Sequence, residues 1–460
     1  MNPSFCGNAS TQCIAAGIPI SHCRFSLSIV RSLYMSLFNK KANQDDHIDR
    51  ISDLPSNVID GILEHLSIRD LVRTSILSTN WRYMWTSVPT LKFQGRSFLP
   101  DDHLNYPSPV VSKIITDVLM LHNGPIYKFN LLIPYGCSFE ITLECLNTWI
   151  PFLSRNVKHL ELVNNGTYLD KMPYIVFSCK ELTKFRFGGF NLSIPPNFSG
   201  FKRLLNLQLQ MVTFESGALE SLISGCPLLE KLRIEYCHGF EYFHISTPTL
   251  KVLSLVFDKN MKSICLKKAQ NLSDLTLMAN DGWVPGLIKS LPKNMQRFCC
   301  IASFSDKKNV FADIIPPTLL KSSFNSIKYL RLANVILNER RELLYIVSVL
   351  KSAPCLVELD IQNYSLVDVA QPPDHSEELE CRSCCLNQLK TVNIKIRATS
   401  NQDAMSLIRF ILATSTSLKT LTFDVGLGSQ KLDALVLLSI SQDLLLMKRA
   451  SQRAEVKFLH

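Results

Sequence analysis

The sequence of 460 residues has no run of about 18 apolar residues, the length that a helix needs to cross a bilayer. It also lacks the signatures of common catalytic folds: there is no phosphate-binding P-loop, no dinucleotide fingerprint, no H-E-x-x-H and no G-x-S-x-G. We therefore predict no membrane association, no cofactor and no catalytic residue. Hydrophobic residues make up 46% and charged residues 19% of the chain, which is typical of a large globular core.

Cysteines are numerous but do not form a framework. The fifteen cysteines are scattered and odd in number, which favours reduced thiols in the nucleus and/or cytoplasm. The nearest approach to a metal site is Cys381-x-x-Cys384, with Cys385 adjacent and His375 upstream. Zinc requires four ligands, and no second pair with suitable spacing exists, so we predict no metal.

The first 44 residues contain no acidic residue and several basic ones. This composition resembles an organelle transit peptide. The alternative is an unstructured leader or an over-long start, and we expect residues 1–44 to be a disordered leader.

Three short helices are expected next. Ile59, Ile62, Leu63 and Leu66 form one apolar stripe with helical spacing, and Pro55 stands where that helix begins. A capping pattern from Ser67 to Asp70 opens a second helix, and Ser78 can cap a third that contains Trp81, Met84 and Trp85. Helices this short cannot bury so many large side chains among themselves, so part of this surface must meet another chain or the rest of this one.

Residues 48–93 resemble an F-box in the form common in plant proteins. The resemblance lies in Leu54-Pro55, the Asp70-Leu71-Val72-Arg73-Thr74-Ser75 run and Trp81-Arg82-x-x-Trp85. It implies docking on the Skp-type adaptor of a cullin–RING ubiquitin ligase. The residues that we expect to supply apolar area to the adaptor, or to the interior of the F-box, are Leu54, Pro55, Ile59, Ile62, Leu63, Leu66, Leu71, Trp81 and Trp85.

Two other interpretations of this segment were weighed. It could be an ordinary helical part of a larger core. A DNA-binding helix-turn-helix would fit the sequence pI of 8.9, but its recognition helix needs polar and basic residues where this chain has tryptophans and a methionine. We therefore expect no nucleic-acid partner.

An apolar pattern of the form Φ-x-x-Φ-x-Φ recurs along residues 110–370 and beyond. The spacing of its central residues is 21–25 residues between Phe185 and Phe298, within the range of leucine-rich repeats. The central residues are Phe129, Leu160, Phe185, Leu207, Leu232, Leu253, Leu275, Phe298, Leu330, Leu359, Val392 and Leu421. The pattern predicts stacked parallel strands on the concave side of a solenoid, with loops and helices, such as residues 339–351 and 403–413, on the convex side. Cys179 and Cys226 precede central residues by six positions, which predicts core packing rather than nucleophiles.

Residues 381–460 resemble an FBD domain. The resemblance lies in Cys385-Leu386-x-x-Leu389-Lys390-Thr391-Val392, Leu418-Lys419-Thr420-Leu421 and the ending from Arg449 to Phe458. The whole chain thus resembles the plant F-box/FBD/leucine-rich-repeat family. The expected fold class is α/β: a short helical F-box, a leucine-rich-repeat solenoid and an FBD-type end.

The resemblance implies a non-catalytic receptor subunit of an SCF-type ubiquitin ligase that binds an unknown protein substrate. On the strand face, the candidate substrate-binding residues are Lys184, Arg186, Lys231, Arg233, Tyr329 and Arg331. This face either prefers an acidic partner segment or is a merely solvated sheet surface. The alternative functions are a repeat scaffold outside any ligase and a secreted repeat receptor, since six N-x-[ST] sequons are present.

Overall fold

The computed structural model divides into two compact units, residues 1–167 and 168–460, and each is described by itself. It describes residues 54–94, 108–133, 141–165, 171–257, 261–279, 287–302, 324–335, 337, 340–363, 386–396, 401–426 and 433–460. The leader of residues 1–44 and the cluster of His375, Cys381, Cys384 and Cys385 lie outside this part of the chain.

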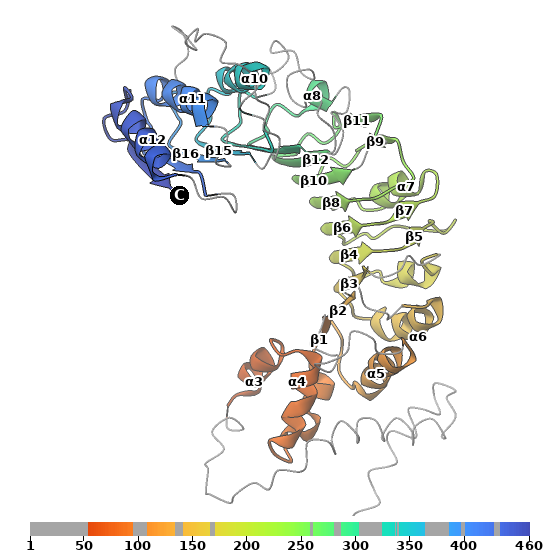
Figure 1. Cartoon of the computed structure of the whole chain (residues 1–460). Helices are drawn as coiled ribbons and strands as arrows, with labels where there is room; N and C mark the ends of the chain where they lie inside the picture. The colour runs from red at the N-terminus through yellow and green to blue at the C-terminus, as the bar shows by residue number, and fades with distance from the viewer. Residues whose placement is uncertain are drawn as a thin grey trace, which may run out of the picture. The chain divides into compact units, whose positions relative to one another are not determined.

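Unit 1 begins with the helices of the F-box-like segment (Figure 1). They are α3 (Ser56–Leu63), α4 (Ile68–Arg73) and the 3₁₀ segments η2 (Thr74–Ile76) and η3 (Trp81–Ser87). Pro55 directly precedes α3, and the Ser67 hydroxyl accepts a hydrogen bond from the Asp70 N–H, as the capping pattern predicts. The α3 helix ends at Leu63, so the predicted apolar stripe does not continue to Leu66 within the helix.

The third predicted helix is a 3₁₀-helix rather than an α-helix. The Ser78 hydroxyl still accepts from the Trp81 N–H, at 3.4 Å. At the other end, the hydroxyls of Thr86 and Ser87 donate to the carbonyls of Tyr83 and Met84, at 2.7 and 3.0 Å. Short helical segments commonly adopt this tighter winding, and these i−3 contacts are made within its last turn.

The rest of unit 1 alternates strands and helices. In chain order they are β1 (Thr90–Gln94), α5 (Ser108–Leu121), β2 (Lys128–Ile133), α6 (Leu143–Leu153) and β3 (His159–Asn164). The strands are parallel and place Leu91, Phe129 and Leu160 at one level. The indole N–H of Trp149 on α6 donates to the Thr116 hydroxyl on α5 at 2.8 Å, and this joins the two helices. The sequence analysis missed β1, although Val88-x-x-Leu91-x-Phe93 has the repeat pattern.

Unit 2 is built on consecutive parallel strands (Figure 1). They are β4 (Lys184–Gly188), β6 (Asn206–Gln210), β8 (Lys231–Glu235), β10 (Val252–Phe257), β12 (Asp274–Ala279), β13 (Arg297–Ala302), β14 (Tyr329–Ala333), β15 (Glu358–Gln362), β16 (Thr391–Lys395), β17 (Thr420–Asp424) and β18 (Glu455–Leu459). The predicted central residues from Phe185 to Leu421 all lie at one level of the sheet. The repeat pattern therefore predicted the strands from β4 to β17 and their register, but not β18.

Helices and short ladders connect these strands. They are η5 (Tyr174–Ser178), β5 (Asn191–Leu192), β7 (Thr213–Phe214), α7 (Ala218–Ser224), β9 (Tyr242–His244), β11 (Ser263–Cys265), α8 (Leu287–Ser290), α10 (Arg340–Lys351), α11 (Asn401–Thr414) and α12 (Ala434–Leu446). The two helices predicted over residues 339–351 and 403–413 correspond to α10 and α11. Within unit 2, Figure 1 shows α7, α10 and α11 on one side of the strands, and none of the described helices lies on the other side of the sheet.

The core of unit 2 lies between the strands and these connections. Each strand contributes two inward apolar residues, and the rings of Phe185, Phe187 and Phe190 follow one another at centroid distances of 5.6 and 4.9 Å. Cys179 and Cys226 are buried, as predicted, and burial raises the pKa of their thiols to about 12 and about 11. The predicted α/β fold class, with repeats of parallel strands, is confirmed.

The turn after several strands has a common backbone geometry. Gly189, Met211, Tyr236 and Asn334 directly follow β4, β6, β8 and β14, and all have positive φ. The N–H of each donates to a carbonyl at the end of the neighbouring strand, and those of Gly189 and Met211 reach Gln210 and Glu235. A non-glycine residue in this region is strained, so the turn is held by these bonds and by the stacking of repeats.

Candidate functional site

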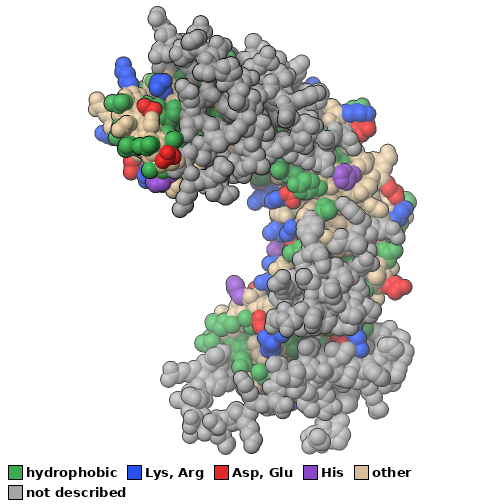
Figure 2. All heavy atoms as spheres, viewed as in Figure 1, with side chains coloured by type: hydrophobic (Ala, Val, Ile, Leu, Met, Phe, Trp, Pro, Cys, Tyr) green, Lys and Arg blue, Asp and Glu red, His purple; other side chains and the backbone are tan. Residues whose placement is uncertain are grey.

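Part of the predicted adaptor-binding set faces outward. Leu54 is 36% exposed and Ile62 is 44% exposed, and Pro55 is also exposed. Val58, which the sequence analysis did not include, is 41% exposed. Val58 and Ile62 are four residues apart and share one face of α3, and Leu54 lies just before the helix, ahead of Pro55. We call these three residues the outer stripe, and Figure 2 shows hydrophobic side chains gathered in this part of unit 1.

Most of the other predicted residues form the interior. Ile59, Leu63, Leu71, Trp81 and Trp85 are all at most 6% exposed, and Leu66 is half-buried. These side chains form the interior of the F-box helices. They support the outer stripe and are not part of it. The sequence analysis missed three further exposed residues. Ile76 lies on η2, Leu77 directly follows η2, and Tyr83 lies on η3. The sequence signal for them is that they are large apolar residues outside the apolar stripe predicted for the first helix.

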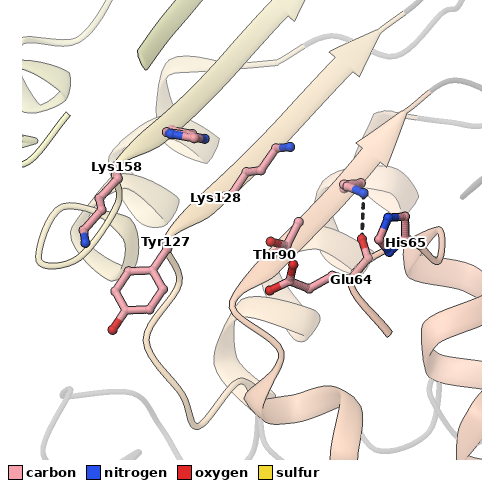
Figure 3. Close-up of a pocket in the computed structure, with 8 residues that line it drawn as sticks. Glu64, His65, Thr90, Tyr127, Lys128 and Lys158 are labelled. Atoms are coloured by element: carbon pink, nitrogen blue, oxygen red, sulfur yellow. Dashed lines mark hydrogen bonds between the residues drawn. The ribbon is translucent and has the colours of Figure 1, made fainter. Parts of the chain in front are cut away.

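Unit 1 also contains an open hollow of about 430 Å³ (Figure 3). It is lined by Glu64, His65, Thr90, Lys92, Tyr127, Lys128, Lys158 and His159. The Lys92 ammonium donates to the Glu64 carbonyl at 2.6 Å, just beyond the C-terminal end of α3, and Lys158 lies over the Tyr127 ring at 5.0 Å. With three lysines and one carboxylate, its lining is basic.

In unit 2, the side of the sheet that faces away from the helices is its open face, formed by the residues that alternate with the inward apolar pair. On β4 and β8 these residues include Lys184, Arg186, Lys231 and Arg233, which we call the basic patch. Lys184, Lys231 and Arg233 are exposed, and Arg186 is half-buried. Figure 2 shows Lys and Arg side chains along this side of the sheet. The structure thus brings four of the six predicted substrate-binding residues together.

The other two predicted substrate-binding residues lie in a different environment. Tyr329 and Arg331 are on β14, four strands beyond β8 in the sheet. The Arg331 guanidinium lies 3.5 Å from the Asp360 carboxylate and donates to the Gln362 carboxamide at 2.8 Å. Arg297 lies over the Tyr329 ring at 4.2 Å, and burial raises the pKa of Tyr329. These side chains already pair with one another across the strands.

In the part of the chain that the structure describes, no group of three or more His, Cys, Asp or Glu side chains could hold a metal ion. None of the helices among those residues has the length and hydropathy of a membrane span.

Comparison with known families matches three successive regions. The F-box domain family matches residues 51–93, and the FBD family matches residues 382–423. Between them, the family described as "FBD-associated F-box protein At5g56370, LRR repeats" matches residues 146–361. The three matches occur in the order that the sequence analysis expected.

Two curated relatives from Arabidopsis thaliana extend the likeness to nearly the whole chain. The F-box/FBD/LRR-repeat protein At1g13570 is 31% identical over 439 residues, which cover 89% of this chain and 98% of that protein. The putative F-box/FBD/LRR-repeat protein At5g44950 is 23% identical over 409 residues, covering 81% of this chain and 92% of that protein. The chain belongs to the F-box/FBD/LRR-repeat family.

Proposed function

We propose that this protein is the substrate-recognition subunit of an SCF-type ubiquitin ligase, acting in the nucleus or cytoplasm. The F-box binds a Skp-type adaptor, and the leucine-rich repeats hold a protein substrate. The observation that carries the proposal is the outer stripe, because three large apolar side chains on α3 and just before it are exposed while Ile59 and Leu63 of the same helix are buried. Burying such area contributes about 25 cal/mol per Å² to association.

The proposed role is not catalytic. Ubiquitin transfer requires a reactive thioester, which belongs to the charged ubiquitin-conjugating enzyme. This subunit contributes proximity by holding a substrate lysine beside that thioester, and such positioning converts a bimolecular encounter into a nearly unimolecular step. The family membership and the F-box match support this division of roles.

Co-purification of the full chain with a Skp-type adaptor tests the proposal. The test variant, called the α3 variant, is Leu54→Ala/Ile62→Ala, which removes one exposed side chain just before α3 and one on it and leaves the buried residues of the helix intact. The matched control is Leu205→Ala/Leu228→Ala, since these leucines of unit 2 are 42% and 49% exposed. We expect the wild type and the control to retain the adaptor and the α3 variant to lose it.

Two results would count against this function. Equal retention of the adaptor by the α3 variant would show that the outer stripe is not the docking surface. A folded wild-type chain that binds no adaptor would leave the alternative, a repeat scaffold outside any ligase. Circular dichroism of each variant separates lost binding from lost folding.

A further inference from the structure

The basic patch has a regular geometry around β6. The sheet register places Asn206 between Lys184 and Lys231, and Gln208 between Arg186 and Arg233. Neighbouring strands are about 4.8 Å apart, so the Cα atoms of the two basic residues at each level lie about 10 Å apart across β6. The two levels are two residues apart along a strand, which corresponds to about 7 Å. The Cα atoms of the four basic residues therefore stand at the corners of a rectangle.

The charges of the patch are only partly neutralised. The strands β4, β6 and β8 carry four cations and one carboxylate, Glu235. Both arginines have partners, since Arg233 forms an ion pair with Glu235 and the partners of Arg186 include the Gln210 carboxamide at 3.3 Å. Lys184 and Lys231 form no ion pair with any residue that the structure describes. The patch thus retains excess positive charge on an accessible surface.

The centre of the rectangle provides hydrogen-bond donors. Gln208 donates one N–H to the Asn206 side-chain oxygen at 3.4 Å. A carboxamide has two N–H donors, so the side-chain NH₂ group of Asn206 and the second N–H of Gln208 remain as donors. An anionic group placed above either carboxamide would therefore meet a neutral donor and a cation on each side.

We propose that the basic patch binds an extended acidic segment of a protein, with the pattern Asp/Glu-x-Asp/Glu. In an extended chain, side chains at i and i+2 point the same way and are about 7 Å apart, which matches the spacing of the two levels. One carboxylate lies between Lys184 and Lys231, and the next lies between Arg186 and Arg233. That this segment belongs to a ligase substrate rests on the proposed function.

A nucleic acid fits this surface less well. A phosphate backbone requires a basic track that continues along its length. The corresponding positions of the next strand, β10, are Val252, Ser254 and Val256, which carry no charge. The patch therefore ends after β8, as suits a short peptide segment.

The test is fluorescence anisotropy of the full chain with a labelled decapeptide that carries Asp-Gly-Asp-Ser repeats. Its control is an isomer of the same composition in which the aspartates are adjacent. We expect the alternating peptide to bind more tightly and its affinity to fall as salt is raised. Lys184→Glu/Lys231→Glu should weaken binding roughly tenfold or more, because two attractions become repulsions. The matched control, Lys202→Glu/Lys268→Glu, reverses two exposed lysines outside the strands and should bind as the wild type does.

The proposal is overturned if both double variants weaken binding equally or if the two peptides bind equally well. It is also overturned if a single-stranded RNA oligonucleotide binds more tightly than the peptide and loses that binding in Lys184→Glu/Lys231→Glu. Adaptor co-purification by the same proteins separates the two proposals. Retained adaptor with no peptide binding removes only the acidic-segment site, whereas peptide binding without adaptor removes only the ligase assignment.

Discussion

The F-box helices and the repeat strands place their apolar side chains differently. In the repeats, alternation directs Leu207 and Leu209 into the core and leaves Gln208 outside, so the open face is polar. In the F-box, the short helices bury Leu63 but leave its neighbour Ile62 exposed, so the outer face is apolar. The two proposals assign a different mode of recognition to each surface: burial of apolar area by the F-box, and charge complementarity on the repeat sheet.

The largest effect is expected from the repeat core. Phe187 is completely buried, between the rings of Phe185 and Phe190. Phe187→Ala should lower the free energy of unfolding of unit 2 by about 3–5 kcal/mol, because a cavity replaces the ring. Urea unfolding measures this loss. The contrasting F-box variant is Tyr83→Ala, which removes a ring that is 65% exposed and should change stability by less than about 0.5 kcal/mol. Similar losses in both variants would contradict the comparison.

Two adjacent residues test the F-box itself. Leu63 is 1% exposed and Ile62 is 44% exposed. Leu63→Ala should cost about 2–5 kcal/mol of stability, whereas Ile62→Ala should cost less than about 0.5 kcal/mol. Thermal unfolding and adaptor binding, measured on the same samples, check the pair. If Ile62→Ala unfolded the F-box as Leu63→Ala does, the outer stripe would belong to the core.

Alkaline pH should weaken the repeats more than the F-box. Burial raises the pKa of Cys179 to about 12 and of Cys226 to about 11, from an ordinary value of 9.0. Below pH 9 both the folded and the unfolded thiols are protonated, so their contribution is fully present. As pH rises from 9 toward 11, the unfolded chain loses these protons first and stability falls, by roughly 1.4 kcal/mol per pH unit for each thiol.

The control for this prediction is the double variant Cys179→Ala/Cys226→Ala. Its stability should fall less steeply above pH 9 than that of the wild type, in denaturant titrations at several pH values. Residues 54–94 contain no cysteine, so unfolding of the F-box should not acquire this slope. Parallel curves for the wild type and the double variant would show that the thiols do not ionise on unfolding.

The smallest effect concerns two glycines. A Cβ added at Gly61, inside α3, would have nothing within 4 Å, so Gly61→Ala should stabilise the F-box by up to about 1 kcal/mol. Gly217 in unit 2 has equally open surroundings but a φ of +72°. Gly217→Ala should therefore destabilise unit 2 by about 1–2 kcal/mol, since an L-residue is strained in that region. Differential scanning calorimetry measures both, and shifts of the same sign would refute the distinction.

The repeat fold could be predicted because its cause is local and periodic. Each Φ-x-Φ pair alternates across a strand, and strands of equal pattern stack in register, so Phe185, Leu207 and Leu232 align. The capping hydroxyl of Ser67 is also a local feature. Strand β1 has the same pattern but was not predicted, because it lies at the end of the F-box-like segment. The pattern of the third helix did not reveal its 3₁₀ winding, because α and 3₁₀ spacings differ little over seven residues.

The amino-acid sequence by itself determined the order of the F-box, repeats and FBD region, the strand register and the identity of the inward residues. Only the tertiary structure decided which apolar F-box residues remain outside, because exposure of Ile62 or Leu63 depends on where α4 and η3 pack. It also decided that the basic patch keeps unpaired lysines while Arg331 is matched with Asp360. Those pairings join residues from different strands, and the sequence pattern of a single repeat carries no information about the side chains beside it.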